Sequence, residues 1–419
     1  MSEERITVEG GRRLSGMIAA SGSKNAVLPI IAAALLSSKP CRITDVPRLA
    51  DVDVICQVLD GLGASLSWES KELVIDASGL SSCEASDEMV RKMRASFLVM
   101  GPLLARMGRA KVSMPGGCAI GARPIELHIK GFEAMGATVR NEQGYVLAET
   151  GGLKGARIYL DFPSVGATEN LMMAAALAKG STVLENAAEE PEIVDLANFI
   201  NGMGGRIRGA GTKIIKIDGV PEMMGCEHQV IPDRIEVGSY LIAAAITGGE
   251  LTVENVIPDH IKPVIAKLAE VGCEIREGEG SLYIKANERL QAVDIKTLPY
   301  PGFPTDMQAQ FMTLMTRAHG ASVITETIFE NRFMHAEELR RMGADIRING
   351  RSAVVEGPAN LQGAAVKASD LRAGMALIIA ALAAEGKSEI GNINVIDRGY
   401  DDLVNKLQGV GASIWRSDQ

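Results

Sequence analysis

The chain has 419 residues, of which 47% are hydrophobic and 23% charged, and its formal net charge is −9. At about 150 residues per domain this length suggests two or three domains, and the composition excludes a disordered or collagen-like chain. The acidic balance argues against general binding to nucleic acid or anionic lipid, so an anionic ligand would need a local cluster of cations.

The sequence carries no sign of a membrane or metal protein. Its first residues, MSEERITVEG, lack an apolar signal segment, and its longest apolar stretch, 373–384, is shorter than the about 20 residues that cross a bilayer. The six cysteines form no CxxC pair and the five histidines no HExxH motif, which argues against zinc and disulfide frameworks. We therefore expect a cytoplasmic protein.

One phrase recurs six times along the chain: the end of a helical pattern, a glycine, and then a strand pattern. The copies read GLGASLSW, AMGATV, GMGGRI, EVGCEI, RMGADI and GVGASIW. Their glycines are Gly63, Gly136, Gly204, Gly272, Gly343 and Gly411. The steps between them are 73, 68, 68, 71 and 68 residues, so six repeats of about 70 residues fill the chain.

Each repeat contains an Ala-rich helix that is apolar nearly all round and must therefore be buried. The first such helix is NAVLPIIAAALL (25–36) and the last is GMALIIAALAA (374–384). A short strand such as CRITDVP (41–47) follows, then an amphipathic helix that ends at the glycine phrase, and a β-hairpin. We predict an α/β fold of six βαβαββ units.

The sixth repeat ends at IWRSDQ, one strand short of the others. RITVEGG (5–11) resembles the missing strand, so we expect it to complete the sixth repeat and to bring both termini into one domain. Three repeats then form each of two domains, residues 22–231 and residues 1–21 plus 232–419. Connections near 20–22 and 231–233 would join them, and a cleft between them could open and close.

Cations recur where helices are expected to begin, although the partial positive charge of a helix N-terminus disfavours them by up to about 1 kcal/mol. The five are Lys24, Arg94, Arg123, Arg372 and Arg398. One interpretation is that they are solvated and paired with neighbours such as Asp370 and Asp397. Their recurrence at equivalent places favours the other interpretation, a site for phosphate and carboxylate groups.

Three glycines flank Cys118 in PGGCAIGARP (115–124), which is too glycine-rich for a stable helix or strand. We expect a mobile loop there. Arg123, five residues on, could lower the pKa of the Cys118 thiol and make it a proton donor or a nucleophile. The other cysteines are expected to be small buried hydrophobic residues.

Asp306 lies in FPTDMQAQF (303–311), before an apolar helix. It could simply cap that helix, or it could be a general base aimed into the cleft, and the sequence leaves the two readings level. Glu189, Glu190, Glu192 and Arg332 also stand at junctions of loops and helices, where they could line a cleft.

The motifs SGSKNA, MRAS, PGGCAIGARP, SVGATEN, FPTDMQAQF, ENRFMH, DLRAGM and DRGY together resemble those of the enolpyruvyl transferase family. The resemblance covers essentially the whole chain. The cysteine loop resembles that of the branch with a UDP-sugar acceptor, whereas the shikimate-pathway branch lacks it. The resemblance implies two inside-out α/β barrel domains, a substrate cleft between them, and the cysteine loop, about 112–123, as a lid.

The activity implied by the resemblance is transfer of enolpyruvyl from phosphoenolpyruvate to the 3-hydroxyl of UDP-N-acetylglucosamine, with release of phosphate, by addition and elimination. This is the first committed step of peptidoglycan synthesis. Cys118 would protonate the methylene carbon and Asp306 would deprotonate the hydroxyl, with Lys24 and Arg398 completing the catalytic set. Cys118 would also react with small electrophilic phosphonates such as fosfomycin and could carry a pyruvyl adduct.

The resemblance implies no metal, no organic cofactor and no obligate protein partner. It implies two sets of binding residues, the first for phosphoenolpyruvate and the second for the UDP-sugar. The first set is Lys24, Asn25, Arg123 and Arg398, supported by Arg332 and Arg372. The second set is Arg94, Arg123, Pro124, Ile125, Glu126, Leu127, Phe162, Pro163, Ser164, Val165, Asp306 and Ile328.

Three places depart from the family pattern. Val395 stands where a His is frequent, Phe162 and Pro163 stand where some members have Lys and Val, and Glu126 replaces a common Asp. The sequence also leaves two alternatives to the implied function. One is the shikimate-pathway transferase, and the other is a non-catalytic six-repeat ring around DNA, although such a ring needs basic inner helices and the buried helices here are apolar.

Overall fold

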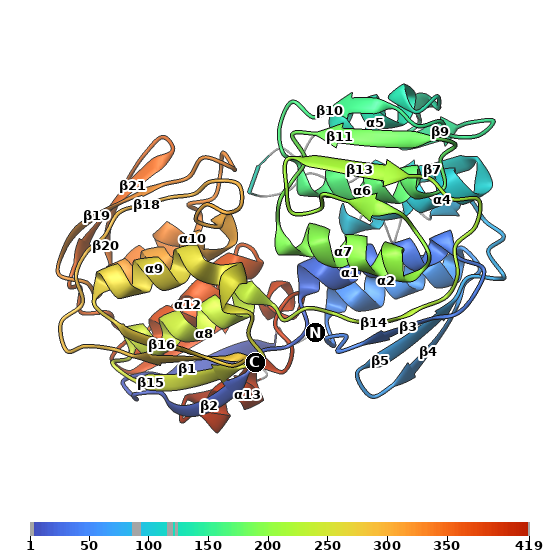
Figure 1. Ribbon diagram of the computed structural model, residues 1–419. Helices are drawn as coiled ribbons and strands as arrows, with labels where there is room; N and C mark the ends of the chain where they lie inside the picture. The colour runs from blue at the N-terminus through green and yellow to red at the C-terminus, as the bar shows by residue number, and fades with distance from the viewer. Residues whose placement is uncertain (1–3, 86–93, 115–119, 122–124, 418–419) are drawn as a thin grey trace. The chain divides into compact units, whose positions relative to one another are not determined.

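The computed structural model describes residues 4–85, 94–114, 120–121 and 125–417, whose path is drawn in Figure 1. In this part of the chain six four-stranded sheets share one plan. In each sheet the opening strand pairs in parallel with the second strand, and two further strands follow in antiparallel pairing, as in the order β10, β11, β13 and β12. The predicted βαβαββ repeat is confirmed.

The chain divides into two units, and we name the first the central unit: Gly22–Gly117 and Arg123–Ile231. Its strands are β3 (Cys41–Thr44), β4 (Ser65–Glu69), β5 (Glu72–Asp76), β6 (Glu84–Ala85), β7 (Arg109–Ser113), β8 (Thr138–Glu142), β9 (Tyr145–Glu149), β10 (Arg157–Tyr159), β11 (Ser181–Glu185), β12 (Ile207–Arg208), β13 (Ile214–Asp218) and β14 (Glu227–Gln229). Its helices are α1 (Lys24–Ala33), α2 (Ala50–Gly61), α4 (Met100–Met107), α5 (Glu126–Ala134), α6 (Val165–Ala176) and α7 (Pro191–Gly202), with 3₁₀ turns η1 (Ala34–Leu36) and η2 (Arg94–Val99).

The other unit, here the terminal unit, comprises Met1–Ser21, Cys118–Ala122 and Pro232–Gln419. Its strands are β1 (Arg5–Glu9), β2 (Ser15–Ala19), β15 (Glu250–Glu254), β16 (Glu274–Gly278), β17 (Ser281–Lys285), β18 (Ile295–Lys296), β19 (Gly320–Thr325), β20 (Asp345–Asn349), β21 (Ser352–Gly357), β22 (Ala365–Lys367), β23 (Lys387–Gly391) and β24 (Ser413–Ser417). Its helices are α8 (Arg234–Ile246), α9 (Lys262–Val271), α10 (Gln308–Met315), α11 (His335–Arg341), α12 (Leu371–Ala383) and α13 (Leu403–Gly409). Its 3₁₀ turns are η3 (Pro258–Ile261), η4 (Thr305–Met307) and η5 (Ile393–Val395). We propose that the two units are the two domains that the repeats predict, with the difference that the segment Cys118–Ala122 groups with the terminal unit and not with residues 22–231.

The N-terminal strand completes the last repeat. β1 lies between β23 and β24 and is antiparallel to both, with Ile6 opposite Ile390 on one side and Arg416 on the other. Both ends of the described chain therefore lie in one sheet, as the unpaired end of the sixth repeat predicts.

Two opening strands come from a distant part of the chain, which the sequence analysis did not anticipate. β14, near residue 228, opens the sheet of the first repeat beside β3, and β2 opens the sheet of the fourth repeat beside β15. The passages at Ser21–Gly22 and Ile231–Pro232 therefore each fall between an opening strand and a helix. The Ser23 N–H donates to the Ile231 carbonyl at 2.7 Å, and the Asp233 N–H donates to the Ser21 carbonyl at 2.8 Å.

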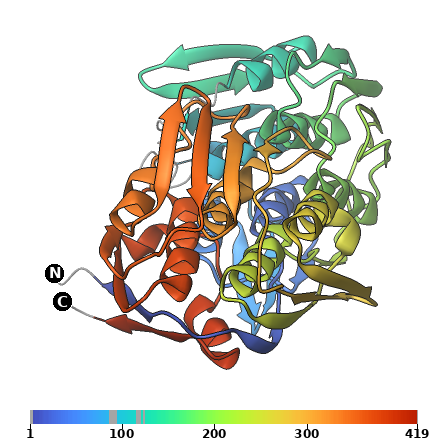
Figure 2. The ribbon, with the colours of Figure 1, turned by 90° about the vertical axis from the view of Figure 1, so that its left-hand side faces the viewer.

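The Ala-rich helices form the interior of each unit, and the sheets lie outside them. In the terminal unit α8, α10 and α12 pack against one another, and in the central unit α4 packs against α6 and α1 against α7. Figure 2 shows the strands of the fifth repeat, in orange, in front of the helices of the terminal unit. This arrangement confirms the inside-out α/β barrel. Among the described residues no helix is long and apolar enough to span a membrane.

The repeated glycine has one structural role in all six copies. Each adopts a positive φ, between 89° at Gly136 and 104° at Gly272. In the first copy the Gly63 N–H donates to the Asp60 carbonyl and the Ala64 N–H to the Leu59 carbonyl, and the same two bonds recur in the other five. This pattern is a Schellman motif, which ends the second helix and turns the chain into the hairpin. Glycine recurs because other residues rarely tolerate this conformation.

Candidate active site

Asp306 lies in the turn η4 that leads into α10, in the terminal unit. No side chain caps η4 or α10, so the helix-cap interpretation of Asp306 is wrong. Its carboxylate instead accepts hydrogen bonds from two guanidinium groups. Arg332 Nη2 lies 2.7 Å from Oδ1, and Arg372 Nη2 lies 3.1 Å from Oδ2.

Both arginines are buried, whereas Asp306 remains accessible. The side chains of Arg332 and Arg372 are 5% and 4% exposed, and that of Asp306 is 25% exposed. The interpretation of Arg372 as a solvated cation is therefore wrong. Burial alone would lower the pKa of Arg372, but the Asp306 carboxylate, followed by Tyr400 and Asp233, raises it above its usual value. This arrangement presents a carboxylate at the surface with fixed positive charge behind it.

Helix capping explains how Arg372 reaches this position. Asp370 caps α12, and its side chain accepts the N–H groups of Arg372 and Ala373 at 3.0 and 3.1 Å. The anionic cap offsets the unfavourable placement of a cation in the first turn, so Arg372 can turn toward Asp306. The Arg372 guanidinium carbon lies 5.6 Å from the centre of the Tyr400 ring.

Buried polar side chains support the start of α10. Gln310, fully buried, donates from Nε2 to the Asp306 backbone carbonyl at 2.9 Å and lies 3.4 Å from the Tyr400 hydroxyl. The Tyr400 hydroxyl lies 2.9 Å from the Ser239 hydroxyl on α8. Burial raises the pKa of Tyr400, although Arg372 opposes the shift. Side chains from α10, α8 and the loop before α13 thereby support the backbone at Asp306.

Two further residues, Glu326 and Thr305, contact each other beside Asp306, and Thr305 also contacts Arg332. Neither was singled out from the sequence. The Thr305 hydroxyl lies 2.8 Å from Glu326 Oε2 and 2.7 Å from Arg332 Nη1. Glu326 is 1% exposed, and its Oε1 accepts the N–H of Ile328 at 2.8 Å. A Glu directly after a strand looks like an ordinary solvated charge in sequence, so no local signal marks it.

The other expected residues of the terminal unit lie in loops. Ile328 is half-buried and follows β19, and Arg398 is half-buried in the turn that precedes α13. Asp397, considered above as a partner for Arg398, pairs with Arg416, whose Nη1 lies 3.1 Å from Oδ2. Within PGGCAIGARP (115–124) the structure describes Ile120 and Gly121, and the Ile120 carbonyl accepts the Asn331 N–H at 3.0 Å.

In the central unit Lys24 begins α1, as predicted, after a Ser23 cap that accepts the Ala26 N–H. Lys24 Nζ lies 3.0 Å from Oδ2 of Asp51, whose side chain is 4% exposed. The lysine side chain is 14% exposed and Asn25, next to it, is half-buried. The buried partner Asp51, in the first turn of α2, is a second residue that the sequence analysis missed.

The expected UDP-sugar residues of the central unit cluster at two helix N-termini. Ile125 is the buried N-cap of α5, Glu126 is exposed in its first turn, and Leu127 is half-buried. Ser164 caps α6 and accepts the Ala167 N–H, followed by half-buried Val165. The preceding residues are Phe162, which is 46% exposed, and Pro163, which is half-buried.

Some of the expected residues lie outside the part of the chain that the structure describes. Cys118, Arg123 and Pro124 lie outside the described residues, and of Arg94 only the backbone is described, where it begins η2. Among the described residues no three His, Cys, Asp or Glu side chains are grouped so that they could hold a metal ion.

Buried acidic side chains meet between α6 and α7. Glu169 and Glu192 are 4% and 2% exposed. Burial raises the pKa of Glu169 well above its usual value, and Glu192 and Glu190 add to the shift. Of the three glutamates near residue 190 that could line a cleft, Glu192 is buried and Glu189 and Glu190 are half-buried.

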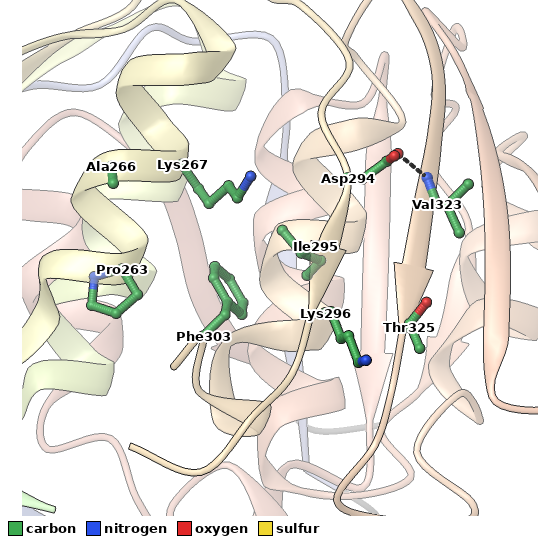
Figure 3. A pocket seen from close by; sticks show the side chains of 9 residues that line it. All are labelled: Pro263, Ala266, Lys267, Asp294, Ile295, Lys296, Phe303, Val323 and Thr325. Atoms are coloured by element: carbon green, nitrogen blue, oxygen red, sulfur yellow. Dashed lines mark hydrogen bonds between the residues drawn. The ribbon is translucent and has the colours of Figure 1, made fainter. Parts of the chain in front are cut away.

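A groove of about 530 Å³ lies elsewhere in the terminal unit, between α9 and strands β18 and β19 (Figure 3). Asp294 Oδ1 accepts the Val323 N–H at 2.7 Å on one side, and Lys267 projects from α9 on the other. Its lining includes none of the residues expected to bind substrate.

Comparison with known proteins identifies the family. The family model described as EPSP synthase (3-phosphoshikimate 1-carboxyvinyltransferase) matches residues 8–407. A protein of Carboxydothermus hydrogenoformans named UDP-N-acetylglucosamine 1-carboxyvinyltransferase 2 is 59% identical over 99% of both chains. A protein of Caldanaerobacter subterraneus named UDP-N-acetylglucosamine 1-carboxyvinyltransferase 1 is 58% identical over 98% of this chain and 99% of its own.

Solved structures agree in fold. The enolpyruvyl transferase NikO from Streptomyces tendae superposes with a TM-score of 0.91 at 26% identity, over the whole of both chains. An EPSP synthase from Acinetobacter baumannii superposes with a TM-score of 0.76 at 20% identity, over 99% of this chain and 100% of its own, which shows the shared fold. The match over residues 8–407 and the relatives at up to 59% identity show that this chain belongs to the EPSP synthase family of enolpyruvyl transferases.

Proposed function

We propose that the chain transfers the enolpyruvyl group of phosphoenolpyruvate to the 3-hydroxyl of UDP-N-acetylglucosamine and releases phosphate, the entry step to peptidoglycan. The observation that carries the proposal is Asp306, an accessible carboxylate held by two buried guanidinium groups. It is supported by the names of relatives at 54% to 59% identity. The proposal includes a cytoplasmic location and no obligate protein partner.

The proposed reaction has two stages. In the addition, a proton goes to the methylene carbon of phosphoenolpyruvate, the sugar oxygen bonds to the central carbon, and Asp306 takes the hydroxyl proton. In the elimination, the resulting methyl group loses a proton and the bond from the central carbon to the phosphate oxygen breaks. We assign the acid role to Cys118. Each proton transfer to or from a positioned side chain contributes about 10²- to 10⁴-fold to the rate, and no metal or organic cofactor is required.

The cations would stabilise the negative charge of the substrates. A guanidinium group binds carboxylate or phosphate through two parallel N–H donors, and Arg332 and Arg372 are already fixed by buried contacts. In our proposal Lys24, Asn25, Arg123 and Arg398 bind phosphoenolpyruvate. The UDP-sugar would contact Arg94, the run 123–127, the run 162–165 and Ile328.

The test is phosphate release from phosphoenolpyruvate with UDP-N-acetylglucosamine or shikimate 3-phosphate as acceptor. We expect release with the UDP-sugar alone, a fall of at least about 10²-fold in Asp306→Asn and Cys118→Ala, and no change in the control Asp345→Asn. Asp345 is exposed on β20 of the same repeat. Release with shikimate 3-phosphate alone would reassign the acceptor, and release with neither would favour a non-catalytic protein.

A further inference from the structure

The residue that follows the second strand of a repeat has a recurring structure. It is Asp45, Asn186, Asn255 or Asn392 in four repeats, with a φ between 56° and 58°. The three asparagine amides donate to a backbone carbonyl just past the opening strand, at 2.7 to 2.9 Å. A short polar side chain in the left-handed conformation therefore ties the ends of two parallel strands together.

Glu326 occupies this place in the fifth repeat. The Thr297 N–H donates to the Thr325 carbonyl at 2.9 Å, as the Ala368 N–H donates to the Gly391 carbonyl before Asn392. Unlike Asn392, Glu326 has no positive φ, and it carries a longer side chain with a charge. The fifth repeat thus departs from these four at a position next to the candidate active site.

The Glu326 carboxylate uses both oxygens. Oε1 accepts the Thr297 hydroxyl at 2.7 Å and the N–H groups of Ile328 and Phe329 at 2.8 and 3.3 Å. Oε2 accepts the Thr305 hydroxyl at 2.8 Å. With 1% of its surface exposed, the side chain ties the end of β18, the turn before α10 and the loop after β19 to one buried charge.

The direction of the hydrogen bonds links this charge to Asp306. A threonine hydroxyl has one proton, and Thr305 gives it to the anionic Glu326, which can only accept. The Thr305 oxygen then presents its lone pairs to Arg332 Nη1 at 2.7 Å. The neighbouring Nη2 of the same guanidinium lies 2.7 Å from Asp306 Oδ1. Glu326 therefore determines which way Thr305 points its proton, and Thr305 orients Arg332.

We infer that Glu326 is a positioning residue for Asp306 and acts through Thr305 and Arg332. The inference rests on the proposed function, since it assumes that Asp306 takes part in the reaction. A merely local role, like that of Asn392, would need only one bond to the opposite strand. Glu326 makes more hydrogen bonds than such a role requires, since it also accepts from Thr305 and from the backbone N–H groups of Ile328 and Phe329.

Substitution by glutamine tests the link at nearly constant volume. The amide oxygen of Glu326→Gln can replace Oε1, which faces three donors, so the NH₂ group must face Thr305. The Thr305 proton then loses its acceptor. The hydroxyl must reorient, so its oxygen no longer accepts the Arg332 Nη1 hydrogen bond in the same geometry. We expect kcat for enolpyruvyl transfer to fall about tenfold or more per folded enzyme, with unfolding followed in urea.

Three further variants separate positioning from general destabilisation. Thr305→Val removes the hydroxyl and should lower kcat as Glu326→Gln does, while Thr305→Ser keeps it and should stay within about threefold of the parent. In the double variant Glu326→Gln with Thr305→Val, kcat should be no lower than in the worse single variant, because both break one link. Glu356→Gln, on the exposed side of β21, is the matched control and should change nothing.

The outcomes separate the inference from the proposed function. Any of three results would overturn the inference. The first is a double variant whose loss of kcat equals the product of the two single losses. The others are an unchanged kcat in Glu326→Gln and equal kcat in Thr305→Val and Thr305→Ser. If Glu326→Gln does not fold, the comparison of valine with serine at position 305 decides alone. Absence of phosphate release in the parent chain with either acceptor would instead overturn the proposed function.

Discussion

Arg372 directs two donors at one oxygen of Asp306, with Nε 3.3 Å and Nη2 3.1 Å from Oδ2. Arg332 takes the other oxygen, Oδ1, at 2.7 Å. The two arginines thus hold the carboxylate from both sides, and each oxygen has its own guanidinium group. Lysine cannot reproduce the first contact, because an ammonium group is a compact charge without the rigid fork of a guanidinium.

Substitution of Arg372 by lysine should therefore impair both activity and stability. We expect kcat in the phosphate-release assay to fall by roughly 10- to 100-fold, and the free energy of unfolding in urea to fall by about 1–3 kcal/mol, because part of a buried charge network loses its partners. Arg347→Lys, on exposed β20, is the control and should leave both quantities unchanged. Equal kcat in the two variants would contradict the role given to the Arg372 fork.

The Lys24–Asp51 pair predicts a measurable coupling in the central unit. The two side chains are 14% and 4% exposed and their charged atoms lie 3.0 Å apart, so solvent screens the pair weakly. A double-mutant cycle with Lys24→Met and Asp51→Asn should give a coupling free energy of about 1–3 kcal/mol in urea unfolding. The exposed pair Lys130–Asp161 should show a clearly smaller coupling, and equal couplings would argue against a buried pair.

His335 predicts a loss of stability in acid. Burial lowers its pKa from 6.5 to about 4, with Asp370 opposing the shift and Arg332 adding to it. Since the folded chain holds His335 neutral while the unfolded chain binds a proton, this contribution is present above pH 6.5 and is lost as the pH falls toward 4. The full loss is about 3 kcal/mol at most.

The measurement is the free energy of unfolding at pH 7, 6 and 5. In His335→Gln the free energy of unfolding should decrease less between pH 7 and pH 5 than in the parent. In the control His319→Gln, at an exposed position, it should decrease as much as in the parent. Parallel curves for the parent and His335→Gln would show that this histidine does not contribute to acid sensitivity.

The repeated glycine phrase supplies a matched pair in its last copy, GVGA. Gly411 has a φ of 96°, whereas Gly409 ends α13 without a positive φ and with nothing near a would-be Cβ. Gly411→Ala should lower the free energy of unfolding by about 1 kcal/mol or more, and Gly409→Ala should leave it unchanged or raise it by up to about 1 kcal/mol. Thermal and urea unfolding of both variants check this, and a neutral Gly411→Ala would contradict the Schellman role.

The repeat plan was readable from sequence because its signals are local. A Schellman motif depends on a few consecutive residues, so its glycine recurs visibly, and the unpaired end of the sixth repeat pointed to 5–11 as its missing strand. No such local signal indicates that β14 opens the sheet of the first repeat and β2 that of the fourth. The partners in these two pairings lie more than 180 positions apart in the chain, so the tertiary structure and not a local signal selects them.

For the candidate site, the sequence by itself indicated candidate residues and the family that they resemble: Asp306 in its loop before a helix, and cations such as Lys24 and Arg372 where helices begin. Only the tertiary structure decided what Asp306 contacts. It brought Arg332 and Arg372, 26 and 66 residues away, onto its two oxygens, and it brought the buried Glu326 within reach through Thr305. The physical reason is that an ion pair depends on the final distance between two side chains, and for Arg372 the packing of α10 against α12 sets that distance.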